Sequence, residues 1–198
     1  MANRFESFDG APDHFDDKVA VGSFLIATPG LEGTPFQRTV IFVLQHNEHG
    51  TFGVVLNRPA DEKMRFAWHE MTGGSDEDPC IVQGGPIGGP VFAIHRDQSL
   101  SELEMPGGIH VSYGADKFSE LLTLDQSACR IVFGVSAWQA GQLASELEAG
   151  KWFQIHVSPD HVFDDPFFMW ENFLRYYGAQ VLADVVGLRA FPENPLDN

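Results

Sequence analysis

The chain has 198 residues, of which 43% are hydrophobic, and its 12 basic and 28 acidic residues give a formal net charge of −16. One domain of this length buries roughly 70% of the surface of its unfolded chain, and the composition excludes a wholly disordered protein. An acidic field repels phosphate backbones, so we expect no direct binding of nucleic acid.

The two ends of the chain differ in composition from its middle. Residues 1–18 are acidic and lack a hydrophobic period, which predicts a flexible arm, and residues 191–198 predict a short tail. A single domain is expected over residues 19–190. No signal peptide and no apolar run of about 18 residues is present, so we expect no membrane contact. Cys80 and Cys129 lie in apolar runs without a CxxC motif, which is typical of a cytoplasmic protein.

Strands dominate the first half of the chain. A short strand is predicted between Gly22 and Thr28, before Pro-Gly. Thr39–Gln45 is continuously apolar, so this strand should be covered on both faces. Thr51–Asn57 is predicted as the next strand. The short connection between the two ends in Gly50, which predicts a hairpin of antiparallel strands.

The middle of the chain predicts one helix and several further strands. Apolar residues at helical spacing indicate a helix over Ala60–Met71. Cys80–Gln83 and Val91–His95 predict strands on either side of a glycine-rich segment, and Ile109–Ser112 predicts another.

Helices alternate with strands in the second half. We expect a helix over Ala115–Leu124 and a buried strand over Cys129–Val135. Ser136 and Gln139 have the spacing of a capping box, which predicts a helix that opens at Ser136 and ends at Gly150.

The last third of the chain predicts a strand over Trp152–Val157 and two helices. Asp165 can cap a helix that ends at Gly178, and a short helix over Gln180–Val186 follows. The apolar stripe predicted for the longer helix is Phe167, Trp170, Leu174 and Tyr177. The order of elements predicts an α/β (α+β) fold with at least one antiparallel pair.

Histidine and carboxylate spacing gives no support for a metal. The pair His46 and His49 encloses Asn-Glu in a predicted turn, and His156 and His161 lie at a strand end, so neither forms an HExxH helix. The acidic run lacks the spacing of a calcium loop. We expect no metal and no cofactor.

Three basic residues, Arg58, Lys63 and Arg65, lie close together beside Asp61 and Glu62. They form either a small anion-binding patch or a solvated turn that precedes a helix. The mixed charges favour the second interpretation.

The glycine-rich segment Gly84–Pro90 begins with Gly84-Gly85-Pro86. It is not a P-loop, because no Lys-Ser/Thr follows, and no helix opens after it as in a dinucleotide-binding motif. A rigid, close-packed turn is the favoured interpretation. A backbone cradle for a ligand or a partner's chain is the alternative.

Ser136 follows a buried strand, where a hydrolase nucleophile can lie. Its surroundings, Gly-Val-Ser-Ala-Trp, lack the second glycine of a nucleophile elbow, and capping would explain the serine. We therefore assign no catalytic residue. A hydrolase with a site near Ser136 remains an alternative.

Several segments together resemble the AlgH/YqgE family of bacterial proteins. They cover most of residues 22–178, in matching order. The matching segments are Phe24-Leu25-Ile26-Ala27-Thr28-Pro29, Phe36-Gln37-Arg38-Thr39-Val40, Leu56-Asn57-Arg58-Pro59, Gln83-Gly84-Gly85-Pro86, and Trp138-Gln139-Ala140-Gly141-Gln142-Leu143. The resemblance implies a flattened, mostly antiparallel β core, or partial barrel, surrounded by helices. It also implies a role in transcriptional regulation, with no catalytic residue assigned.

These observations favour a non-enzymatic, cytoplasmic binding or regulatory domain whose partner is an unidentified protein or small molecule. A hydrolase and a direct DNA-binding regulator are the alternatives, and the net charge disfavours the second. The expected ligand or partner surface consists of Asn57, Gly84, Gly85, Pro86, His95 and Gln142. These residues should converge on one concave surface if they form a site.

Overall fold

The computed structural model describes residues 19–73, 80–113, 117–121 and 126–186. The expected arm (1–18) and tail (191–198) lie outside the described residues. The helices and strands, in chain order, are β1 (Phe24–Ala27), β2 (Val40–Asn47), β3 (Gly50–Val55), α1 (Glu62–Thr72), β4 (Cys80–Gln83), β5 (Ile87–His95), β6 (Leu103–Met105), β7 (Ile109–Ser112), α2 (Phe118–Leu121), β8 (Cys129–Gln139), α3 (Gln142–Glu148), β9 (Trp152–Ile155) and α4 (Pro166–Val186).

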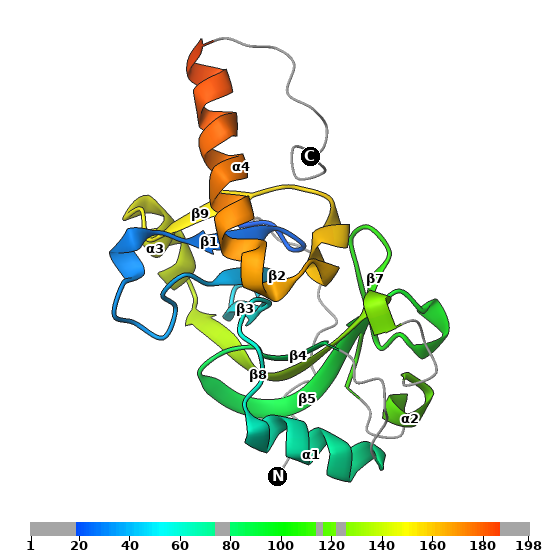
Figure 1. The fold of residues 1–198 in the computed structure, drawn as a ribbon. Helices are drawn as coiled ribbons and strands as arrows, with labels where there is room; N and C mark the ends of the chain where they lie inside the picture. Colours follow the sequence, from blue (N-terminus) through cyan, green and yellow to red (C-terminus); the bar gives the residue numbers. More distant parts are fainter. Residues whose placement is uncertain (1–18, 74–79, 114–116, 122–125, 187–198) are drawn as a thin grey trace.

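The strands form one curled sheet with helices around it (Figure 1). Along the sheet the strand order is β6-β7-β5-β8-β3-β2-β1-β9, and β4 also pairs with β8. All of these pairs are antiparallel except β4 with β8. The mixed α/β fold with a mostly antiparallel core, predicted from the sequence, is confirmed.

The β2–β3 hairpin is the part of the sheet that the sequence predicted most directly. Ile41 lies opposite Val55, and the strands pair antiparallel up to Asn47 and Gly50. Phe42 belongs to the core cluster beneath α4, whereas Ile41 belongs to the cluster beneath α3. Both faces of β2 are therefore covered, as its unbroken apolar sequence predicts.

The helices lie on different parts of the sheet. The first half of α4 crosses β1 and β2, and its second half extends beyond the sheet, whereas α1 lies at the opposite end of the molecule (Figure 1). Met169 and Phe173 of α4 are buried against the sheet. A third core cluster, which includes Trp68 of α1 and Ile131 of β8, lies at the α1 end.

The predicted helix start at Ser136 is wrong. Ser136 belongs to β8, because β3 takes over as the pairing strand after β4 and places Gly53 opposite Ser136. The strand therefore continues to Gln139. Helix α3 begins at Gln142, after Gly141, whose φ of 73° suits glycine.

Two other boundaries differ from the prediction. Gly178 does not end a helix, because α4 continues as a single helix to Val186. A glycine inside a helix costs only about 1 kcal/mol relative to alanine, and the residues that follow favour a helix. Strand β5 begins at Ile87, so the second half of the glycine-rich segment is strand, with a register irregularity between Ile87 and Val91.

Candidate functional site

Strand β8 shows that the expected surface residues are spread over the molecule. His95 lies opposite Cys129, at the start of β8, whereas Gln142 follows Gln139, at its end. Ten residue steps separate the two ends, which corresponds to at most roughly 33 Å along the curled strand, and His95 is buried whereas Gln142 is exposed on α3. The structure therefore does not bring His95 and Gln142 together.

Gly84 and Gly85 lie where the two halves of the sheet meet, and both are buried. The N–H of Gly84 donates to the Phe133 carbonyl, and its own carbonyl accepts from the N–H of Val55, each at 2.8 Å. A Cβ at Gly84 would meet the carbonyl oxygen of Gly134 at 2.4 Å, so a side chain has no room. Close packing explains the two glycines, and Pro86 is exposed beside them.

Ser136 is fully buried in β8, and its hydroxyl donates to the carbonyl of Gly84 at 3.1 Å. An attacking serine needs a base that takes its proton and a path for the substrate. A hydroxyl that donates to a backbone carbonyl in the core has neither. Its role here is to fasten the glycine turn to β8.

His95 and Ser112 form a serine–histidine pair, which the sequence did not reveal. Its Nδ1 accepts the N–H of Asp97, so Nε2 carries the proton and donates to the Ser112 hydroxyl at 2.8 Å. Ser112 in turn donates to the carbonyl of Leu100. Both side chains are fully buried. The histidine is thus a donor to the serine rather than its base, and the pair ties β5 to β7.

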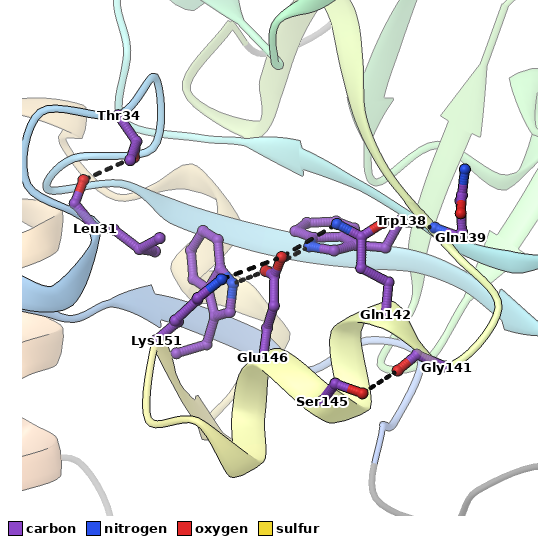
Figure 2. A network of polar contacts seen from close by, with 10 residues as sticks. Leu31, Thr34, Trp138, Gln139, Gly141, Gln142, Ser145, Glu146 and Lys151 are labelled. Atoms are coloured by element: carbon purple, nitrogen blue, oxygen red, sulfur yellow. Dashed lines mark hydrogen bonds and ion pairs between the residues drawn. The ribbon is translucent and has the colours of Figure 1, made fainter.

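Gln142 belongs to a polar network that centres on Glu146 (Figure 2). The Glu146 carboxylate accepts the indole N–H groups of Trp138 at 3.1 Å and Trp152 at 2.8 Å, and the Gln142 amide at 3.1 Å. Burial alone raises the pKa of Glu146, but these donors and Lys151 outweigh it and hold the pKa below its usual value. The network anchors α3 to β8 and β9.

Asn57 has a definite structural partner in Arg38. Its side-chain oxygen accepts the N–H of Val40, and its amide donates to the carbonyl of Arg38, both at 2.8 Å. Arg38 has a φ of 54°, which costs a residue with a side chain on the order of 1–3 kcal/mol. Asn57 therefore holds a strained arginine at the end of the turn that precedes β2.

The Arg38 side chain lies on the outer surface of α4. Its guanidinium stacks over the Trp170 ring, 4.7 Å from the ring centre, and donates to Glu171 at 2.7 Å. The Trp170 indole donates to the carbonyl of Ala27, which fixes the ring. Phe167 lies one helical turn before these residues and is 77% exposed. We call Arg38, Phe167, Trp170 and Glu171 the α4 face.

The sequence predicted the α4 face only in part. Phe167 was expected in the buried stripe of the helix, and that expectation is wrong, because Met169 and Phe173 fill the core instead. Trp170, like Leu174, is partly buried against the same cluster. The run Phe-Phe-Met-Trp contains more apolar residues than one helix face can bury. This excess was the feature of the sequence that could have predicted an exposed aromatic residue on the helix.

No group of three or more metal-binding side chains occurs among the residues that the structure describes. Within the same residues, no helix is long and apolar enough to span a membrane. Cys80 is partly buried and Cys129 is buried, and neither forms a disulfide.

Bacterial sequences match most of the chain and most of their own length. A "UPF0301 protein" of Chlorobium chlorochromatii is 36% identical over 85% of this chain and 93% of its own length. A "UPF0301 protein" of Thermobifida fusca is 31% identical over 93% of this chain and 98% of its own length.

Two solved structures have the same fold. The solution structure of the AlgH protein from Pseudomonas aeruginosa matches with a TM-score of 0.65 at 24% identity, over 91% of this chain and 99% of that one. A crystal structure of a Corynebacterium diphtheriae protein matches with a TM-score of 0.64 at 25% identity, over 83% of this chain and 90% of that one. The family model described as AlgH-like matches residues 24–182. The chain therefore belongs to the AlgH-like family.

Proposed function

We propose that this chain is a cytoplasmic, non-enzymatic binding domain that recognises a protein partner through the α4 face. The observation that carries the proposal is an exposed phenylalanine, Phe167, one turn from a tryptophan that an arginine covers. Aromatic residues and arginine are the side chains that contribute most to binding at protein interfaces. Phe167 and Trp170 are held on one helix and Arg38 is held against it by Trp170 and Glu171, so these side chains can bind a partner without a large loss of conformational entropy.

The buried serines favour a binding domain over a hydrolase. Ser136 and Ser112 both donate their hydroxyl protons to backbone carbonyls, and both are inaccessible to solvent. Of the residues expected to form a ligand surface, Asn57 belongs with the α4 face, because it holds Arg38. In a regulatory role, the domain would act through contacts with another protein, since its net charge opposes contact with DNA.

A photo-crosslinker at the α4 face tests this proposal. Phe167 is replaced by p-benzoylphenylalanine in the full chain, expressed in the cells that produce the protein. The control carries the same residue in place of Phe66, which is 66% exposed on α1 at the other end of the molecule. We expect a discrete adduct from position 167 that an excess of co-expressed wild-type protein reduces.

Two results would contradict the proposal. One is the same set of adducts, or none, from both positions. The other is covalent labelling of Ser136 or Ser112 by a fluorophosphonate probe in the native protein, which would favour the hydrolase.

A further inference from the structure

We infer that the partner segment bound by the α4 face is acidic, with a carboxylate that binds Arg38 and an aromatic or aliphatic side chain that packs on Phe167 and Trp170. This inference rests on the proposed function, since it specifies the chemistry of the partner at the same surface. Four observations support it: the preset position of Arg38, the local charge, the exchangeable ion pair, and the exposed ring.

Arg38 is held in place before any partner arrives. The Asn57 side chain forms hydrogen bonds with the carbonyl of Arg38 and the N–H of Val40, which fixes the backbone at Arg38. The Trp170 ring supports one face of the guanidinium. Arginine presents a planar fork that matches a carboxylate, and little side-chain freedom is lost when the fork is already oriented. A strained backbone conformation at an exposed arginine is itself typical of binding sites.

Two further arginines accompany Arg38 near the α4 face, together with the carboxylates of Glu171 and Asp165. Arg175 follows Glu171 by one helical turn, and Arg58 donates to the carbonyl of Pro35 in the turn that leads to Arg38. Screening at physiological salt limits exposed charges to a range of about 8 Å. A partner carboxylate that displaces Glu171 from Arg38 therefore meets a surface that carries positive as well as negative charge, and acidic residues on other parts of the molecule are screened from it.

Glu171 occupies the site that a partner carboxylate would take. Its pair with Arg38 is short, at 2.7 Å, but the side chains of both residues are more than half exposed. Exposed pairs of this kind contribute little to stability. A partner carboxylate can therefore replace Glu171 on the guanidinium at little cost.

The apolar part of the α4 face indicates that the partner binds with an apolar side chain as well as a carboxylate. Phe167 is exposed, and Trp170 is only partly buried by the core and Arg38. An aromatic or aliphatic side chain next to the partner's carboxylate would cover both rings and exclude water from the ion pair. Exclusion of water strengthens the charged contact.

The test uses three fluorescein-labelled synthetic peptides and the full chain at physiological salt. The first peptide alternates acidic and aromatic residues, the second carries amides in place of the acids, and the third carries serines in place of the aromatics. Fluorescence anisotropy gives each Kd. We expect the first peptide to bind at least about tenfold more tightly than either of the others, which is about 1.4 kcal/mol.

Three variants identify the residues responsible. Arg38→Gly should weaken binding of the first peptide about tenfold or more, yet keep the fold, because glycine accepts a φ of 54° without strain and the bonds of Asn57 go to the backbone. Glu171→Gln should tighten binding about two- to threefold, because it removes the competing carboxylate. The control, Lys63→Ala, removes one positive charge from an exposed position of α1, at the other end of the molecule, and should change the Kd less than about twofold.

The outcomes separate this inference from the proposed function. Equal binding of the acidic and amide peptides, equal losses in Arg38→Gly and Lys63→Ala, or no binding of any peptide would overturn the acidic partner. In each case a specific adduct from the crosslinker at position 167 would leave the proposed function standing. A failure of the crosslinker at that position would overturn both.

Discussion

Arg130 places a guanidinium in the core, where it joins three segments of the chain. Its Nη1 donates to the Leu56 carbonyl at 2.8 Å, and its Nη2 donates to the Asp164 carbonyl. Burial lowers the pKa of Arg130, whereas Cys80 and the carboxylates of Asp164 and Asp165 act in the opposite direction. Like Ser136 and His95, this polar side chain of the sheet holds the fold together.

His95 makes stability depend on pH. Burial is the main cause that lowers its pKa from 6.5 to about 4; His110 and Lys117 act in the same direction, and Asp97 opposes them. As the pH falls below 6.5, the unfolded chain binds a proton that the folded chain refuses, so stability falls until the pH reaches about 4. This difference corresponds to at most about 3 kcal/mol.

Urea unfolding at a series of pH values measures this effect. His95→Gln keeps a donor for Ser112 but does not titrate, so its stability should change less between pH 6.5 and 4 than that of the wild type. Parallel pH profiles for the two proteins would show that His95 does not contribute.

The helices and strands that the sequence predicted correctly are those whose sequence pattern lies within the element itself. An unbroken apolar run and a short loop ending in Gly50 were sufficient for β2, β3 and their antiparallel pairing, which the structure confirms. Strands β1, β4 and β7 and helix α1 were also predicted close to their observed bounds. Each carries its signal within a few residues, so no distant partner is needed to recognise it.

The elements that were missed depend on distant partners. Strand β8 extends past Ser136 only because β3 pairs with its second half, and capping-box spacing cannot reveal that partner. The exposure of Phe167 follows from the angle at which α4 crosses β1 and β2, which leaves Met169 and Phe173 to fill the core. Of the expected surface residues, Asn57 alone belongs with the α4 face. Its contact with Arg38 spans 19 positions, which a local pattern does not show.

Helix α3 depends on one carboxylate. The Glu146 carboxylate accepts three hydrogen bonds, from both indole N–H groups and the Gln142 amide. In Glu146→Gln one of the two oxygens becomes an amide NH₂, so at least one partly buried donor loses its acceptor. We expect a loss of about 1–3 kcal/mol in the free energy of unfolding. Thermal unfolding followed by tryptophan fluorescence measures the loss at Trp138 and Trp152.

The matched control is Glu148→Gln, an exposed position on the same helix that should change stability by less than about 0.5 kcal/mol. The pH dependence gives a second check. Folding lowers the pKa of Glu146 below its value of 4.5 in the unfolded chain. The carboxylate therefore stabilises the fold fully above pH 4.5, and this stabilisation is lost as the pH falls through the lower pKa of the folded state. Equal losses in the two variants would contradict a special role for Glu146.

At the scale of the whole molecule, charge determines which large partners can approach. The net charge is −16. The two arginines of the candidate basic patch, Arg58 and Arg65, already form hydrogen bonds within the protein. Arg58 donates to the carbonyl of Pro35, and Arg65 donates to the carbonyl of Ala60 at the start of α1. The Asp61 carboxylate caps the same helix by accepting a hydrogen bond from the N–H of Met64. These contacts agree with a solvated turn before a helix and leave no continuous basic stripe among the described residues.

We therefore expect no meaningful affinity for duplex DNA. A protein that binds DNA specifically reaches a Kd of about 10⁻⁸ M or tighter at physiological salt, and even non-specific binding depends on several phosphate contacts with lysine or arginine. Anisotropy titrations with labelled duplexes should show no saturable binding at physiological salt, and lower salt should not restore it, because weaker screening strengthens the repulsion. A basic DNA-binding domain of similar size serves as the positive control. Submicromolar, sequence-selective binding would overturn this expectation, and a regulator that contacts DNA directly would then replace the protein-binding domain.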